Sequence, residues 1–213
     1  MGEVRAVDQD RPSKDVLVEA AEVLRAQGVL VMPTASVYGI GCAATPGNPA
    51  HGRIFDIKRR DRAQTLPWLV ADEEDLDRFG RDVPVWAHAL ARAFWPGALT
   101  LVVRASAAVP AEYRRLGDET IALRLPNSNL VRDLARGVGV PLATTSANVH
   151  GAPSATTGAA VDARLLELAD LTLDAGPAPI AVASTIVDCT TPQPRLLREG
   201  TITAGEVLRV ASE

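Results

Sequence analysis

Aromatic side chains, cysteine and histidine are scarce in this sequence, and each shortage narrows what the protein can be. Aromatic residues make up 4% of the 213 residues, so aliphatic side chains must fill most of the core. The two cysteines, Cys42 and Cys189, stand far apart and in no CxxC spacing. The sequence therefore predicts neither a zinc site nor a disulfide framework, and both thiols are expected to be reduced.

Histidine is equally sparse, and no Ser-His-Asp or Cys-His set is apparent in the sequence. His51, His88 and His150 are expected to be surface or turn residues rather than catalytic bases. This argues against a hydrolase that works through an activated nucleophile.

Long hydrophobic runs are also missing. No apolar run approaches the about 18 residues of a membrane span. The N-terminal stretch MGEVRAVDQDRPS is charged and has no apolar segment of the kind found in signal peptides. We expect a cytoplasmic protein with no membrane partner. The net charge of −4 argues against a protein that coats nucleic acid by bulk electrostatics, although a local basic patch remains possible.

Helical and strand patterns alternate along the chain, which predicts an α/β fold with a central twisted sheet and helices packed on it. At 213 residues the length suits one sizeable domain. Helices are expected at residues 14–27, 50–58, 85–94, 130–136 and 159–168, and from Thr203, where Glu206 completes a capping box. Strands are expected at residues 29–33, 66–70, 99–104, 120–125, 141–144, 171–173, 185–188 and 195–198. Residues 105–119 form the one long irregular stretch, a mobile lid or a wandering loop.

Four polar stretches stand beside these apolar runs in a fixed order. They are PTASVYGIG at residues 33–41, RIFDIKRRDR at 53–62, TTSANVHGAPSATT at 144–157, and ASTIVD with LLREG at 183–200. Open α/β sheets place ligands at loops that leave strand ends. A hydroxyl- and glycine-rich stretch is often no more than a turn, but two such stretches follow two buried strands here, which favours a binding site.

The second stretch is strongly basic. Apolar residues 54, 55 and 57 anchor its first part, so Lys58 and the residues after it are expected to project from a helix end. Two interpretations stay open at this point. The cations could be a solvated cluster that complements the helix dipole, or they could clamp a polyphosphate. No Walker loop is apparent in the sequence.

The order of short motifs resembles the YrdC-like family of threonylcarbamoyl-AMP synthases. The resemblance rests on PT-x-S-VYG-x-G, RIF-x-IK-x-R, FWPG-x-LTL, A-x-R-x-P, PL-x-x-x-SAN-x-x-G-x-PS and STIVD…LLR-x-G, from about residue 16 to residue 203. The chain is similar to the short, single-domain form of the family. The resemblance implies one YrdC-like domain over residues 1–213, with a core from about 14 to 203. The family fold is a twisted open mixed sheet with flanking helices and a concave ligand-binding face.

The resemblance also implies an activity and its partners. Such enzymes combine ATP, L-threonine and bicarbonate into threonylcarbamoyl-AMP and pyrophosphate, with Mg²⁺ assisting and no metal site of the protein's own. A tRNA-modifying transferase complex then moves the threonylcarbamoyl group to an adenosine beside the anticodon, and the basic stretch of this chain could also touch tRNA.

Residue roles carried over from the family fall into two groups. Lys58 and Arg60 would hold ATP phosphates and act catalytically by neutralising charge. The nucleotide would also contact Gln64, Thr120, Ser146, Asn148, Ser154 and Arg198. The threonine would be cradled by Ser36, Arg124, Thr144 and Ser184, with Arg124 as a natural bidentate partner of its carboxylate.

Several neighbours of these positions depart from the family pattern, among them Ala35, Asp61, Ala183 and Glu199. This drift leaves room for a second interpretation, a diverged paralogue that binds nucleotide or RNA without making the product. A third, the YrdC-like module of hydrogenase maturation factors, is disfavoured because those proteins are much longer and carry cysteine-paired zinc fingers.

Overall fold

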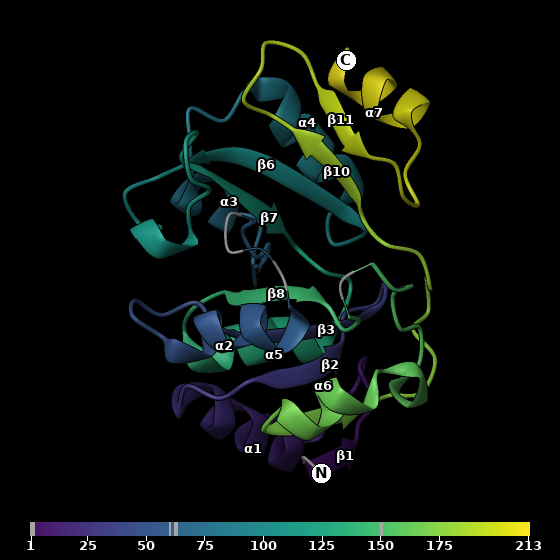
Figure 1. Cartoon of the computed structure of the whole chain (residues 1–213). Coiled ribbons are helices and arrows are strands. Elements are labelled where there is room, and N and C mark those ends of the chain that lie inside the picture. The colour runs from purple at the N-terminus through teal and green to yellow at the C-terminus, as the bar shows by residue number, and fades with distance from the viewer. Residues whose placement is uncertain (1–2, 60, 62–63, 150) are drawn as a thin grey trace.

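The computed structural model describes residues 3–59, 61, 64–149 and 151–213, and Figure 1 shows their arrangement. The helices are α1 (Lys14–Arg25), α2 (Pro49–Lys58), α3 (Asp75–Phe79), α4 (Val85–Phe94), α5 (Asn129–Val138), α6 (Ala163–Leu168) and α7 (Ala204–Ala211). The strands are β1 (Glu3–Ala6), β2 (Leu30–Pro33), β3 (Tyr38–Ala43), β4 (Trp68–Leu69), β5 (Gly80–Arg81), β6 (Leu99–Ala105), β7 (Thr120–Arg124), β8 (Leu142–Ser146), β9 (Leu171–Asp174), β10 (Thr185–Asp188) and β11 (Arg195–Arg198).

All strands belong to one open, mixed sheet, which confirms the predicted α/β class. Their order is β1-β9-β2-β3-β8-β4-β7-β6-β10-β11, and β5 pairs with β6 off this path. The sheet contains both parallel pairs, such as β6 with β10, and antiparallel pairs, such as β3 with β8. The strand β4 has only two residues, yet it joins the halves of the sheet, because it pairs with β8 on one side and with β7 on the other.

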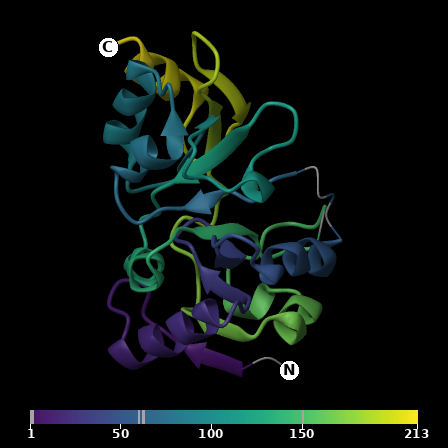
Figure 2. The ribbon, with the colours of Figure 1, turned by 90° about the vertical axis from the view of Figure 1, so that its left-hand side faces the viewer.

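Helices cover both faces of the sheet. Figure 2 shows α1 and α5 on one side, and α2 and α6 on the other. The residues of β2 divide accordingly: Leu30 and Met32 join the apolar cluster under α1 and α5, whereas Val31 joins the larger cluster on the opposite face. This division confirms that the continuously apolar β2 is buried on both faces. None of the described helices is long and apolar enough to cross a membrane.

The predicted helix boundaries are confirmed where a capping signal exists. The Ser13 hydroxyl accepts from the backbone N–H of Val16 at the start of α1. Thr203 and Glu206 form the predicted reciprocal capping box of α7. The helix predicted from residue 159 was wrong at its start. A 3₁₀ turn occupies Gly158–Ala160, and α6 begins only after Asp162, whose carboxylate accepts from Arg164.

The stretch at residues 33–41 was also interpreted incompletely, because most of it is strand rather than loop. Tyr38 and Ile40 of β3 point into the core, while Gly39 and Gly41 face the neighbouring β8. The glycines on one face hide the alternation that would have predicted a strand. They do permit the close backbone approach expected of them, since a Cβ on Gly41 would lie 2.4 Å from Thr144 Oγ1.

The irregular stretch at residues 105–119 is tied to the core by Tyr113. This side chain is 1% exposed, packs on the Trp68 ring with centroids 5.4 Å apart, and donates to the Thr45 carbonyl at 2.9 Å. A 3₁₀ turn at Ala111–Tyr113 presents it to the core. The segment is therefore anchored at its middle, and its role as a lid stays a prediction.

We expect Gly41→Ala to destabilise the fold, because the new methyl group would displace Thr144 and the Ala143 carbonyl, 2.9 Å away. Overpacking of this kind costs about 1–3 kcal/mol, measurable by chemical denaturation. Gly137→Ala is the matched control: a Cβ there meets nothing within 4 Å inside α5, and we expect a gain of about 0.4–1 kcal/mol. Equal effects of the two substitutions would contradict this account.

Candidate functional site

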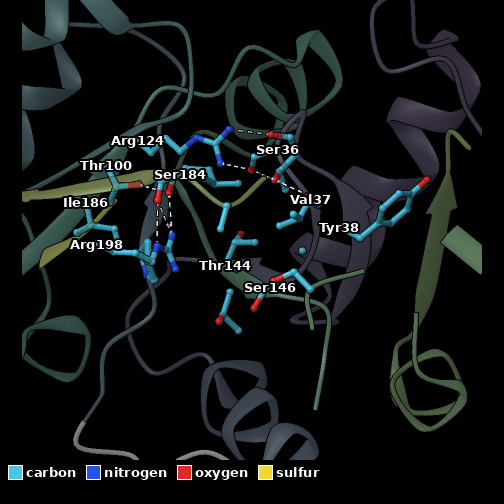
Figure 3. Close-up of a pocket in the computed structure, with 17 residues that line it drawn as sticks. Ser36, Val37, Tyr38, Thr100, Arg124, Thr144, Ser146, Ser184, Ile186 and Arg198 are labelled. Atoms are coloured by element: carbon cyan, nitrogen blue, oxygen red, sulfur yellow. Dashed lines mark hydrogen bonds between the residues drawn. The ribbon is translucent and has the colours of Figure 1, made fainter. Parts of the chain in front are cut away.

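A polar cavity of about 210 Å³ opens on the sheet near the junction made by β4. It is lined by the turn between β2 and β3, by β4, β6, β7 and β8, and by the segments around β10 and β11. Figure 3 shows these side chains converging from segments far apart in the sequence. The lining residues are Thr34, Ser36, Val37, Tyr38, Gly39, Pro67, Leu69, Thr100, Arg124, Thr144, Thr145, Ser146, Ser154, Ala183, Ser184, Ile186 and Arg198.

Most of the candidate residues meet at this cavity. The four assigned to threonine line it together, as do three of those assigned to ATP: Ser36, Arg124, Thr144, Ser184, Ser146, Ser154 and Arg198. Gln64 and Thr120 are outside the lining, and Asn148 stands just behind Ser146. Arg60 lies outside the described residues, as do Arg62 and His150.

Arg124 is the most unusual of these side chains because it is a buried cation. It is 5% exposed, and its three nitrogens donate to the Gly97 carbonyl at 2.8 Å, the Ser36 hydroxyl at 2.7 Å and the Thr34 carbonyl at 3.0 Å. Burial, and to a smaller extent the charge of Arg198, lower the pKa of Arg124 to about 10, so it stays charged at neutral pH.

No carboxylate of a described residue forms an ion pair with Arg124. A guanidinium carries five N–H groups, and the three hydrogen bonds above leave two of them for another acceptor. A buried, charged and partly unsatisfied fork at a cavity is suited to bind a carboxylate in bidentate geometry.

A second hydrogen-bonded group lines the cavity close to Arg124. The Ser184 hydroxyl is 2.9 Å from the Thr100 hydroxyl and accepts from Arg198 Nη2 at 3.2 Å. The Ser184 carbonyl accepts from Arg198 Nε and Nη2, at 3.0 and 2.8 Å. Gly200 passes so close that a Cβ there would lie 2.1 Å from the Ala183 carbonyl. These contacts fix the segment that carries Ser184.

The prediction that Lys58 projects from the end of its helix was wrong. Its side chain is 2% exposed and its ammonium group turns toward β8. It donates to the backbone carbonyls of Ser146 and of Asn148, the latter at 2.7 Å, and lies 3.4 Å from Asn148 Oδ1. The Ser146 hydroxyl donates to the same amide oxygen. Lys58 therefore holds the loop after β8, and its charge lies directly behind Ser146 at the cavity.

The place of Lys58 on α2 accounts for this direction, because it lies four residues after the buried Ile54 on the same face of the helix. Arg59 adopts a left-handed conformation, with φ of 51°, and its N–H donates back to the Asp56 carbonyl, which ends the helix.

Two predicted nucleotide contacts lie away from the cavity lining. Gln64 is exposed and its N–H donates to the Asp61 carbonyl at 3.1 Å. Thr120 is buried at the far end of β7 and donates to Asp118 Oδ1 at 2.8 Å. Four strand steps separate it from Arg124, roughly 13 Å.

Sequence reasoning missed Thr100 and the apolar part of the wall. Thr100 lies inside the run LTLVV, where a single hydroxyl reads as one more β-branched residue. The one available signal is the alternation along β6. Leu99 and Leu101 enter the core, so Thr100 between them must face the other side of the sheet. Tyr38 borders the cavity with its backbone, while its phenol points away, 2.9 Å from Asp174 Oδ1 (Figure 3). Burial raises the pKa of Tyr38 to about 12.

The chain resembles known proteins over nearly its whole length. The Sua5/YciO/YrdC family model, described as Telomere recombination, matches residues 22–200. A Mycobacterium leprae protein is 37% identical over 205 residues, which cover 95% of this chain and 90% of that protein. A Bacillus subtilis protein named threonylcarbamoyl-AMP synthase is 34% identical over 208 residues, covering 96% of this chain and 59% of its own length.

Solved structures agree with the sequence relatives. The crystal structure of Pyrococcus abyssi Sua5 complexed with L-threonine superposes with a TM-score of 0.90 at 33% identity, over 97% of this chain and 60% of that one. The crystal structure of Escherichia coli YciO gives 0.89 at 25% identity, over 98% and 100%. These comparisons match the resemblance found in the motifs, and the chain belongs to the Sua5/YciO/YrdC family.

Proposed function

We propose that this chain synthesises threonylcarbamoyl-AMP and pyrophosphate from ATP, L-threonine and bicarbonate. One observation supports this most: the charged, buried Arg124 lines a small cavity rich in hydroxyls, and two of its five N–H groups have no acceptor among the described residues. The cavity is below the roughly 300–1,000 Å³ of drug-sized ligand sites, which suits an amino acid, while a nucleotide would extend beyond it. Relatives that carry the synthase name, and a relative solved with L-threonine, support the same assignment.

Threonine binding follows from the donors and acceptors of the cavity. Arg124 would take the carboxylate, with Ser36 held against its guanidinium at 2.7 Å. Thr144, whose hydroxyl donates to the Leu142 carbonyl at 3.1 Å, and Ser184 would complete the cradle. The hydroxyls of Ser36 and Thr144 then orient the amine and hydroxyl groups of the ligand.

The chemistry proceeds in two balanced steps. The neutral threonine amine attacks the carbon of bicarbonate, and loss of water leaves a carbamate. A carbamate oxygen then attacks the α-phosphorus of ATP, the bond from that phosphorus to the bridging oxygen of the β-phosphate breaks, and pyrophosphate leaves. The carbamate is already an anion, so the second step needs no general base; alignment and charge neutralisation suffice. No histidine lines the cavity among the described residues.

The triphosphate would lie along the loop after β8. Ser146 and Ser154 line that side of the cavity, Lys58 places its charge behind Ser146, and Arg198 faces them from β11. Asn148 contributes by holding the loop, and Arg60, Gln64 and Thr120 remain predictions as nucleotide contacts. The product would pass to a tRNA-modifying transferase complex, and direct tRNA contact through the basic stretch also stays a prediction.

Mg²⁺ fits this site as a companion of ATP. No described residue of the cavity lining is acidic, and the described residues hold no group of three or more metal-binding side chains. Mg²⁺ is commonly held by substrate phosphates with few protein ligands, so the ion would enter on the phosphate oxygens beside Ser146 and Ser154. There it would supply charge neutralisation for the leaving pyrophosphate.

Pyrophosphate release by the purified chain tests the proposal. We expect release with ATP and Mg²⁺ only when L-threonine and bicarbonate are both present, in buffer freed of carbon dioxide. Release without the co-substrates would point to another nucleotide reaction. ATP binding without any release would favour the diverged, non-catalytic paralogue.

A further inference from the structure

Thr100 forms a hydroxyl pair with Ser184, and the assignment of threonine and ATP contacts gives Thr100 no role. Both are buried, at 2% and 7% exposure, and both line the cavity. The parallel pairing of β6 with β10 sets Thr100 beside Ile186. The antiparallel pairing of β6 with β7 matches Leu101 with Leu123, so Thr100 lies next to Arg124 across the ladder. Thr100 thus stands between the strands that carry Arg124 and the Ser184 segment (Figure 3).

The hydrogen-bond inventory of the pair leaves one proton unused. Two hydroxyls carry two protons, and one of these lies in the 2.9 Å bond between Thr100 and Ser184. Arg198 approaches Ser184 as a donor, so it consumes no proton. Among the described residues no further acceptor contacts either hydroxyl. Whichever hydroxyl is not the donor within the pair therefore directs its proton at the cavity.

This side of the cavity is consequently cationic and donates hydrogen bonds. Arg198 donates a hydrogen bond to Ser184, and its positive charge lowers the pKa of Arg124 further. An ammonium group would be repelled here, so the amine of the zwitterion cannot be what the pair receives. An anion that presents acceptor oxygens is favoured, and Arg124 already provides for the threonine carboxylate.

We propose that the Thr100–Ser184 pair, backed by Arg198, receives the oxyanion of bicarbonate and then the carbamate oxygens formed from it. This inference rests on the proposed function. It places the second anion of the reaction beside the one held by Arg124, so that the threonine amine between them meets the bicarbonate carbon. Thr100 is then a positioning residue that acts with Ser184.

Steady-state kinetics of Thr100→Val tests the assignment, with bicarbonate varied in buffer free of carbon dioxide. Valine preserves the shape and removes the hydroxyl. We expect the KM for bicarbonate to rise about 10- to 100-fold, as for the loss of a hydrogen bond to an ion, while the KM values for threonine and ATP and the kcat at saturating bicarbonate change less than about threefold. Thr100→Ser should restore the wild-type KM.

Two further variants separate this effect from damage to the fold. Thr172→Val alters another threonine, 2% exposed on β9, whose hydroxyl has no partner among the described residues, and should leave every KM unchanged. Ser184→Ala combined with Thr100→Val should be little worse than either alone, because both remove the same donor.

Three outcomes would overturn the inference. A matching rise in the threonine KM would assign the pair to threonine, a rise confined to ATP would assign it to a phosphate, and no change would leave it a structural contact. Wild-type pyrophosphate release that does not depend on bicarbonate would instead defeat the proposed function, before any variant is compared.

Discussion

Replacing Arg124 with alanine is expected to abolish most of the affinity for L-threonine while ATP binding persists. The guanidinium is buried and charged, and two of its N–H groups have no acceptor among the residues that the structure describes. Because it is already removed from water, it loses little hydration when a carboxylate forms a bidentate ion pair with it. Truncating one partner of such a desolvated pair costs about 2–5 kcal/mol, or about 30- to 5,000-fold in affinity. Calorimetric titration of threonine and of ATP, each alone, measures both effects.

Two substitutions make the Arg124 result specific. Arg124→Lys keeps the charge but loses the planar fork, and should recover only part of the affinity. Arg136→Ala removes an exposed arginine of α5 that pairs with Asp72 at 2.5 Å, and should bind both ligands as the wild type does. An equal loss of ATP affinity in Arg124→Ala, with circular dichroism unchanged, would refute the assignment of Arg124 to threonine.

Ser36→Ala guards against the possibility that Arg124→Ala simply fails to fold. Removing Arg124 leaves the carbonyls of Gly97 and Thr34 without a donor, which costs stability at each buried acceptor. Ser36→Ala removes only the hydroxyl that contacts Arg124 Nη1 at 2.7 Å and should weaken threonine binding more modestly. A threonine affinity unchanged in both variants would place the ligand elsewhere.

The sequence predicted the elements of the fold where local signals are strong. Capping residues fixed the starts of α1 and α7, and the continuously apolar residues of β2 indicated a strand buried on both faces. It did not predict β1, β5 or α3, which are short and exist through pairing and packing rather than pattern. It also did not predict β3, in which two glycines hide the alternation. The order of strands in the sheet depends on contacts between distant segments, which no local pattern reports.

The site residues at the strand ends could be predicted from the sequence, whereas Thr100 within a strand and the direction of the Lys58 side chain could not. Ser36, Thr144 and Ser184 follow apolar runs, so their place at strand ends could be inferred, and the structure brings them to one cavity. Thr100 lies within an apolar strand, and the ammonium group of Lys58 contacts carbonyls of Ser146 and Asn148, far away in the sequence. Both depend on three-dimensional pairing.

The departures from the family pattern fall at different distances from the cavity. Ala183 lines it directly, beside Ser184. Ala35 is buried in the turn after β2 with φ of 65°, a conformation that is uncommon outside glycine. Asp61 and Glu199 are exposed. Only the first two therefore bear on the shape of the site. A small side chain at both leaves the hydroxyls of Ser36 and Ser184 in place.

Lys58→Met is expected to lower kcat/KM for ATP by about 30- to 1,000-fold, the equivalent of 2–4 kcal/mol of lost transition-state stabilisation. Methionine keeps the buried aliphatic stem and removes the charge. Two effects should combine: the phosphates lose a cation behind Ser146, and the loop after β8 loses the donor that joins its Ser146 and Asn148 carbonyls. Pyrophosphate release at varied ATP measures the sum.

Comparison with the other lysine of the chain separates charge from position. Lys14 begins α1 on the exposed surface, so Lys14→Met removes the same charge away from the cavity and should leave kcat/KM unchanged. Asn148→Ala disturbs the loop but keeps the ammonium, and should lose less activity than Lys58→Met if the charge dominates. If Lys58→Met retained more than about a third of wild-type activity, Lys58 would be only a structural anchor of the loop, and the phosphates would have to be neutralised from elsewhere, with Arg198 the remaining described cation of the cavity on that side.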